Sequence, residues 1–154
     1  MSQLLGKTAP GFAITDEDGT VHELSQIEED YVLLYFYPKD STPGCTIEAN
    51  EFNKALSKFA KAGTAVIGIS GGTEKSKEKF CEKNSLSLTL LSDPDFAVSD
   101  KYGVYGEKKM AGRKYLGIKR TTFIIGPQRK VIKVFDSVKP EGHAKEVLDF
   151  LQTL

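Results

Sequence analysis

The chain has 154 residues, of which 40% are hydrophobic, and its 21 basic side chains balance 21 acidic ones. This size suits one substantial core, so we expect residues 1–154 to form a single domain. A net charge of zero provides no field that would attract nucleic acid or an anionic membrane, and neither is an expected partner. The N-terminal segment lacks a leader pattern and no apolar run is long enough to span a membrane, which predicts a soluble, cytoplasmic protein.

The predicted structure opens with a β-hairpin. Segments 11–16 and 21–24 flank the sequence "EDGT", whose Asp18-Gly19 pair is a strong signal for a tight hairpin turn. We expect this N-terminal β-hairpin to lie at the periphery of the fold.

Two strands and two helices follow in alternation. The run "YVLLYFYP", residues 31–38, is continuously apolar, which predicts a strand buried on both faces at the centre of a sheet. Apolar residues at helical spacing predict one amphipathic helix from Pro43 to about Lys61. Segment 64–70 predicts a second buried strand, and the lysine-rich segment 73–84 predicts a helix whose lysines solvate one face. This order predicts that the two strands are parallel.

The second half of the chain adds shorter elements. A strand at 88–93 precedes a short helix at 95–103, and the stretch from Gly103 to Gly117, rich in lysine and glycine, is predicted to be a loop. Two further strands and a closing helix are predicted at 120–126, 130–138 and 142–154. The whole pattern predicts an α/β fold in which helices flank both faces of a mixed central β-sheet.

One of the two cysteines stands where the central strand gives way to the first helix. Thr42 and Pro43 favour a helix start, because threonine is expected to cap the first amides with its hydroxyl and proline needs no N–H there. Cys45 is then the third helical residue, where unpaired amides and the helix dipole favour an anion. Gly44 leaves the backbone beside the sulfur open to a small reactant. We therefore predict that Cys45 is a reactive thiol and not an inert core residue.

The helix terminus alone is too weak to ionise this thiol. An ordinary thiol has a pKa of about 8.5, and each unit of lowering takes about 1.4 kcal/mol. A helix N-terminus supplies roughly 0.3 to 1 kcal/mol, and up to about 2 kcal/mol when the group is partly buried. A nearby cation is therefore needed. Arg120 is the natural candidate, because it stands at the mouth of the strand at 120–126, where a parallel neighbour would direct it toward the Cys45 helix.

The same residues carry a resemblance to a known family. Pro38, Thr42 and Cys45 in "PKDSTPGC" match the active-site pattern of peroxiredoxins, and "YFYPKD" with "TPGCT" resembles the peroxiredoxin Q, or bacterioferritin comigratory protein, subfamily. The resemblance runs nearly end to end, through "GKTAPGFAITDEDG", "LLSDPD" and "YGVYGEKKMAGRKYLGIKRTTFIIG". It implies a thioredoxin-like fold and thiol-dependent reduction of hydrogen peroxide or alkyl hydroperoxides, without a metal or organic cofactor.

The resemblance also implies a role for each site residue. Cys45 would be the peroxidatic cysteine that becomes a sulfenic acid, and Arg120 would polarise both the thiol and the peroxide. The Thr42 hydroxyl would orient the peroxide, and Pro38 would shield the pocket. Glu48, one turn beyond Cys45, is expected on the helix surface, although by resemblance it would help to hold Arg120.

The second cysteine is the candidate resolving thiol. Many peroxiredoxin Q proteins carry this cysteine five residues after the first, but Asn50 occupies that position here. Cys81, on the next predicted helix, resembles a subset of the family that resolves from that helix, and its disulfide with Cys45 would be reduced by thioredoxin or a similar dithiol. Because a disulfide needs Cα atoms within about 7 Å, we expect local unwinding before it forms. The alternative is a one-cysteine mechanism resolved by an external thiol.

Three other function classes remain as alternatives. A thioredoxin-type dithiol oxidoreductase would share the fold but needs a CxxC pair, and Thr42 occupies the place of the first cysteine. A cysteine hydrolase needs a histidine base beside the thiol, and neither His22 nor His143 is suitably placed. In a binding module without catalysis, both cysteines would be structural. Proteins of the resembling subfamily are often monomers, so a monomer is expected.

Overall fold

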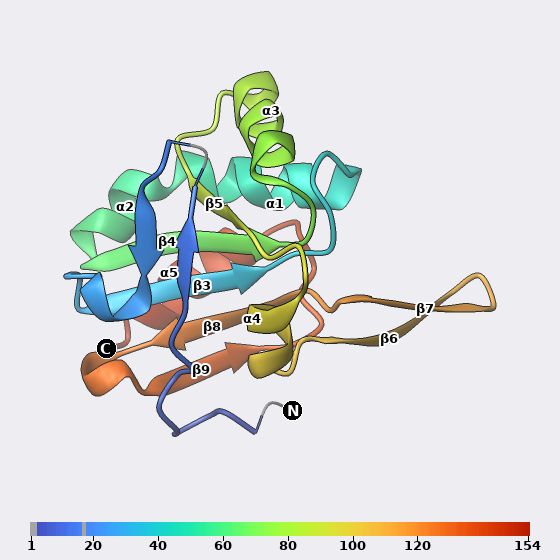
Figure 1. The fold of residues 1–154 in the computed structure, drawn as a ribbon. Helices are drawn as coiled ribbons and strands as arrows, with labels where there is room; N and C mark the ends of the chain where they lie inside the picture. Colours follow the sequence, from blue (N-terminus) through green and yellow to red (C-terminus); the bar gives the residue numbers. More distant parts are fainter. Residues whose placement is uncertain (1–2, 17) are drawn as a thin grey trace.

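A five-stranded sheet forms the centre of the protein (Figure 1). In the computed structural model, which describes residues 3–16 and 18–154, its strands lie in the order β5-β4-β3-β8-β9. Their bounds are Thr89–Ser92 (β5), Thr64–Ser70 (β4), Tyr31–Phe36 (β3), Thr121–Ile125 (β8) and Val131–Phe135 (β9). Strand β4 is parallel to β3 and β5, whereas β8 is antiparallel to β3 and β9. The predicted mixed sheet, with the strand from Tyr31 at its centre, is confirmed.

Alternate residues of β3 enter two separate cores. Leu33 and Tyr35 belong to one buried cluster, whereas Val32, Leu34 and Phe36 belong to the other. Since successive side chains of a strand point to opposite faces, both faces of the sheet are covered. This explains why the strand is continuously apolar.

Helices lie on both faces of this sheet, as predicted. The first core is built with residues of four helices, α1 (Pro43–Lys54), α2 (Leu56–Lys61), α3 (Glu74–Asn84) and α5 (His143–Leu151). The short helix α4 (Ala97–Lys101) and the hairpin of β1 (Ala13–Thr15) and β2 (Val21–Glu23) pack on the second core. Two single 3-10 turns lie at Leu24–Gln26 and Pro127–Arg129. Within the described ranges, none of the helices combines the length and apolar character that crossing a membrane requires.

The N-terminal hairpin is confirmed. Strands β1 and β2 pair antiparallel, with Thr15 opposite Val21, and Gly19 in the turn has a φ of +82°. That backbone conformation strongly favours glycine. Residue 17 of the predicted turn lies outside the described residues.

The prediction of a loop between Gly103 and Gly117 is wrong. This stretch forms a second antiparallel hairpin, β6 (Tyr105–Met110) and β7 (Arg113–Ile118), which projects away from the central sheet in Figure 1. Ala111 and Gly112 form its two-residue turn, and both have positive φ values, 52° and 79°. Residues 113–116 of β7 are exposed, and exposed strand residues need no apolar face, so the sequence lacks the alternation that would have indicated a strand there.

The prediction of one helix from Pro43 to Lys61 is also wrong. The chain forms α1 and α2 with a break at Ala55, whose ψ is 2°. Ala55 is buried in the first core. Alanine is the strongest helix former, so no local signal indicates this break, which follows from packing. The other predicted elements are found within a few residues of their expected bounds.

Candidate active site

Cys45 is the third residue of α1, as predicted, because the helix begins at Pro43. Its side chain is only 2% exposed and packs in the first core. The first turn closes with a hydrogen bond of 2.9 Å from the Thr46 N–H to the Thr42 carbonyl. The sulfur therefore lies at the amide-rich end of a twelve-residue helix, where the backbone favours negative charge.

Arg120 contacts the sulfur directly. Its Nη2 donates to Cys45 Sγ at 3.4 Å, and its Nη1 donates to Glu48 Oε1 at 2.7 Å. The proximity of Arg120 to Cys45 agrees with the sequence prediction, but the neighbouring strand is not parallel. Strand β8 is antiparallel to β3, with Thr121 opposite Phe36, and this register brings Arg120 to the end of β3 that leads into α1.

Gly44 makes room for the guanidinium. A Cβ atom at this position would lie 3.2 Å from Arg120 Nη2 and 3.3 Å from Pro140 Cγ. Both distances are tighter than ordinary van der Waals contact, so a side chain here would require the guanidinium and Pro140 to shift by a few tenths of an ångström. The glycine thus gives Arg120 room, and the expectation that it also leaves the backbone open to a small reactant stays a prediction.

Glu48 holds Arg120 from the buried side of the site. Its side chain is only 1% exposed, so the prediction of a helix surface residue is wrong and the alternative, a partner of Arg120, is correct. Burial raises the pKa of Glu48 to about 7, although the ion pair with Arg120 opposes this shift. Burial also disfavours the charged guanidinium, but Glu48 and Cys45 together raise the pKa of Arg120, which stays charged at neutral pH.

The wild-type protein is expected to lose stability relative to Glu48→Gln as the pH rises from about 4.5 to about 7. A carboxyl whose pKa is higher in the folded state binds its proton more tightly there. Its contribution to stability is therefore complete below the unfolded pKa and is lost as the pH rises through the folded one. Across this pH range, the unfolding free energy of the wild type is expected to fall by on the order of 1–3 kcal/mol relative to that of Glu48→Gln. Urea denaturation of both proteins across this range measures it, and a pH-independent difference would contradict the burial of the carboxyl.

The Thr42 hydroxyl does not cap α1, contrary to the prediction. It donates to the Lys39 carbonyl at 3.0 Å, within the tight turn that precedes the helix. Ser41 in this turn has a φ of 63°, and a threonine hydroxyl readily bonds a nearby carbonyl in such a turn. Pro38 is half-buried just beyond β3, in the same segment.

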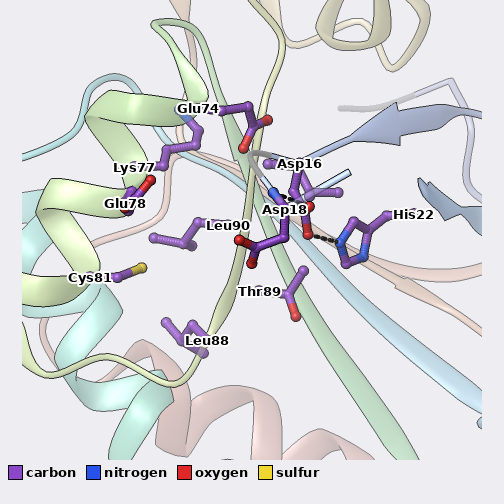
Figure 2. Close-up of a pocket in the computed structure, with 11 residues that line it drawn as sticks. Asp16, Asp18, His22, Glu74, Lys77, Glu78, Cys81, Leu88, Thr89 and Leu90 are labelled. Carbon is purple, nitrogen blue, oxygen red and sulfur yellow. Dashed lines mark hydrogen bonds and ion pairs between the residues drawn. The ribbon is translucent and has the colours of Figure 1, made fainter. Parts of the chain in front are cut away.

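Cys81 is half-buried on α3 and, like Cys45, is a free thiol. Its sulfur points into a cavity of about 310 Å³ (Figure 2). Burial raises the pKa of the Cys81 thiol, Asp40 adds to this effect, and Lys77 opposes it. The described residues that line the cavity come from the first hairpin, α3, β5 and the segments beside them: Asp16, Asp18, His22, Glu74, Lys77, Glu78, Cys81, Leu88, Thr89, Leu90 and Leu91.

A buried ion pair near the site was not predicted. The lysines of α3 were expected to be solvated, but Lys77 is only 2% exposed and its Nζ lies 3.2 Å from Asp40 Oδ2. Lys77 stands three residues before Phe80, the aromatic residue of α3. This spacing places the two side chains on one helix face, and it is the signal that could have identified Lys77.

The family model described as "AhpC/TSA family" matches residues 5–134. The chain belongs to the AhpC/TSA family. Peroxiredoxin Bcp of Escherichia coli strain K12 is 41% identical over 147 residues, which cover 96% of this chain and 94% of that protein. The resemblance to the bacterioferritin comigratory protein subfamily is thereby confirmed.

Solved structures of similar proteins share the fold. One similar structure comes from a study of the alkyl peroxide reduction activity of Xanthomonas campestris bacterioferritin comigratory protein. Its TM-score to this chain is 0.90 and its sequence identity is 36%. The superposition covers 99% of this chain and 98% of that one. Two cysteine-to-serine mutants of Xanthomonas campestris Peroxiredoxin Q each have a TM-score of 0.85 and 39% identity, with 92% of this chain and 90% of that one covered. The predicted thioredoxin-like fold is confirmed.

Proposed function

We propose that this protein is a thiol-dependent peroxidase that reduces hydrogen peroxide and alkyl hydroperoxides. The observation that carries the proposal is the hydrogen bond from Arg120 to the buried sulfur of Cys45 at the start of α1. A guanidinium and a helix N-terminus both favour the thiolate, which is the nucleophilic form of cysteine. The alkyl peroxide reduction activity studied in the Xanthomonas campestris relative supports this substrate class.

In the first half of the proposed reaction, the Cys45 thiolate attacks one peroxide oxygen. The O–O bond breaks, and the other oxygen leaves as hydroxide or alkoxide and takes up a proton to become water or an alcohol. Cys45 is oxidised by two electrons to a sulfenic acid. Arg120 stabilises the charge on the leaving oxygen. The Thr42 hydroxyl, which donates its hydrogen to the Lys39 carbonyl, orients the peroxide by accepting a hydrogen bond from it, and Pro38 shields the peroxide from solvent.

In the second half, Cys81 resolves the sulfenic acid. An intramolecular disulfide forms with Cys45, water is released, and thioredoxin or a similar dithiol reduces the disulfide by exchange. The two serine mutants of the Xanthomonas campestris relative support this role, because their substituted positions are 36 residues apart, as Cys45 and Cys81 are here.

We also propose that residues 1–154 act as one domain and as a monomer in the cytosol. The contacts of Arg120 with Cys45 and Glu48 lie within a single chain, which supports this proposal. A chain with only two cysteines, too few for a disulfide scaffold, suits a reducing compartment.

Intact-mass analysis after one equivalent of hydrogen peroxide tests the proposal. The wild-type protein is expected to lose two hydrogens, because the sulfenic acid condenses with Cys81. The Cys81→Ser variant is expected to gain one oxygen, which a sulfenic acid reagent such as dimedone traps. A stable oxygen adduct in the wild type would instead indicate an external resolving thiol. No mass change in either protein would contradict peroxidase activity.

A further inference from the structure

Helix α3 is held to the rest of the protein by two buried side chains, by the partly buried Cys81, and by Glu74, whose Oε1 accepts a hydrogen bond from the Ser92 N–H at 2.6 Å. Lys77 and Phe80 are its buried residues. The Phe80 ring packs in the first core, with its centroid 6.5 Å from that of Tyr37. A helix with one large apolar contact depends strongly on its polar contacts, so the partners of Lys77 matter for its position.

The Lys77 ammonium is fully hydrogen-bonded. Its Nζ donates to Asp40 Oδ2 at 3.2 Å, to Ser70 Oγ at 2.8 Å and to the Gly71 carbonyl at 2.8 Å. An ammonium has three donors, and each has an acceptor here. These bonds attach the first half of α3 to the end of β4 and to the segment that contains Asp40.

Asp40 is the acceptor that joins α3 to the segment before α1. Besides the bond from Lys77, its carboxylate accepts bonds from Tyr37 Oη at 2.6 Å and from Ser76 Oγ at 2.8 Å. Asp40 is only 9% exposed and lies five residues before Cys45, in the segment between β3 and α1. The network therefore joins the helix that carries one cysteine to the segment that leads to the other.

The reduced structure does not direct Cys81 toward Cys45. The Cys81 sulfur points into the cavity of Figure 2, and α1 contributes none of the described residues that line it. Because a disulfide requires close Cα atoms and a specific geometry, Cys81 must leave this position to bond with Cys45. Movement of α3 breaks the bonds of Ser76 and Lys77 to Asp40.

We propose that Asp40 and Lys77 are positioning residues, which hold α3 in the reduced enzyme and so set the rate at which Cys81 reaches the sulfenic acid on Cys45. This inference rests on the resolving role proposed above for Cys81. In the step concerned, the Cys81 sulfur attacks the Cys45 sulfur, the S–O bond breaks, and the hydroxide leaves with the thiol proton as water. The oxidising equivalents come from the peroxide already consumed.

The rate of this step matters for survival of the enzyme in peroxide. A sulfenic acid that waits for its resolving thiol is open to a second peroxide, which oxidises it to sulfinic acid. A tightly held α3 therefore makes the enzyme more sensitive to inactivation, and a loosely held one protects it.

The Lys77→Met variant tests the proposal, with Lys79→Met, an exposed lysine of the same helix, as the matched control. Rapid acid quenching followed by intact-mass analysis separates Cys45 oxidation, whose rate rises with peroxide concentration, from disulfide formation, whose rate does not. Lys77→Met is expected to form the disulfide roughly tenfold faster, because the loss of hydrogen bonds to a charged group outweighs the loss of the lysine charge that opposes the raised pKa of the Cys81 thiol. Its oxidation by peroxide is expected to stay near the wild-type rate, and Lys79→Met is expected to match the wild type in both steps.

The outcomes separate this proposal from the one it rests on. If the wild type forms no intramolecular disulfide, the resolving role of Cys81 is wrong. If the wild type forms one and Lys77→Met forms it no faster, only the positioning role is overturned. If Lys77→Met is oxidised more slowly by peroxide but forms the disulfide at the wild-type rate, Asp40 and Lys77 act at the peroxide site, and the positioning role is again overturned.

A milder variant keeps the proposal testable if Lys77→Met does not fold. Ser76→Ala removes one bond to Asp40 and leaves the ion pair in place, so a smaller acceleration of disulfide formation is expected. Hydrogen exchange followed by mass spectrometry gives a second readout on the reduced enzymes. The amides of α3 are expected to exchange faster in both variants than in the wild type, and equal exchange would contradict the proposed attachment.

Discussion

The Cys45→Ser variant is expected to lose peroxidase activity by roughly 10³-fold or more, as when a catalytic nucleophile is removed from another enzyme. A serine hydroxyl stays protonated at neutral pH, even beside the guanidinium of Arg120 and at the start of α1. Oxygen also cannot replace sulfur in the sulfenic acid that carries the oxidising equivalents. A thioredoxin-coupled assay of peroxide consumption measures the loss.

Cys81→Ser is the matched control for this experiment. It is expected to oxidise Cys45 at the wild-type rate in its first turnover and then to stop, because thioredoxin receives no disulfide. The exchange of sulfur for oxygen at Cys45 is nearly isosteric, so the Cys45→Ser variant is expected to keep its fold. Its melting temperature, compared with that of the wild type, checks this. Undiminished peroxide consumption by a folded Cys45→Ser variant would place the chemistry elsewhere.

The Arg120→Ala variant is expected to oxidise Cys45 roughly 10² to 10³ times more slowly than the wild type. The variant loses the donor that lies 3.4 Å from the sulfur, and with it the charge that stabilises the leaving oxygen. Stopped-flow measurement of the second-order rate constant with hydrogen peroxide tests this expectation. A rate constant within a few-fold of the wild-type value would show that the helix terminus alone activates the thiol.

Two further variants separate this chemical effect from a loss of stability. Removing Arg120 leaves Glu48 buried without its cation, which costs on the order of 3–5 kcal/mol if the carboxyl stays charged. The double variant Arg120→Ala with Glu48→Gln removes that penalty, and its oxidation is expected to remain slow. Arg120→Lys keeps the charge, but an ammonium cannot reproduce the planar fork that contacts Cys45 and Glu48 together, so an intermediate rate is expected.

The parts of the fold that the sequence predicted correctly have strong local signals. The apolar run from Tyr31 identifies the central strand because both of its faces are buried. The pair Asp18-Gly19 identifies the first hairpin, since Gly19 adopts a positive φ. Thr42 and Pro43 identify the start of α1, and hence the position of Cys45 within it, even though the threonine hydroxyl bonds a different group.

The features that the sequence did not predict depend on contacts between distant segments. The β6–β7 hairpin turns at Ala111-Gly112, a weaker turn signal than Asp-Gly, and the exposed residues 113–116 of β7 show no alternation. The spacing of Lys77 and Phe80 places Lys77 on the inner face of α3, but no local pattern reveals its partner Asp40, 37 residues earlier. The antiparallel pairing of β8 with β3 likewise follows from the complete topology and not from either segment.

The 75 residues that separate Cys45 from Arg120 have a consequence for the protein during its synthesis. The ribosome completes α1 well before it adds Arg120, and the guanidinium reaches the sulfur only when β8 has paired with β3. On the proposed role of Arg120, a nascent chain therefore carries a thiol that its activating cation has not yet reached. Sensitivity to oxidants is acquired only at the end of folding, which protects the unfinished polypeptide from damage by the molecules that the mature protein destroys.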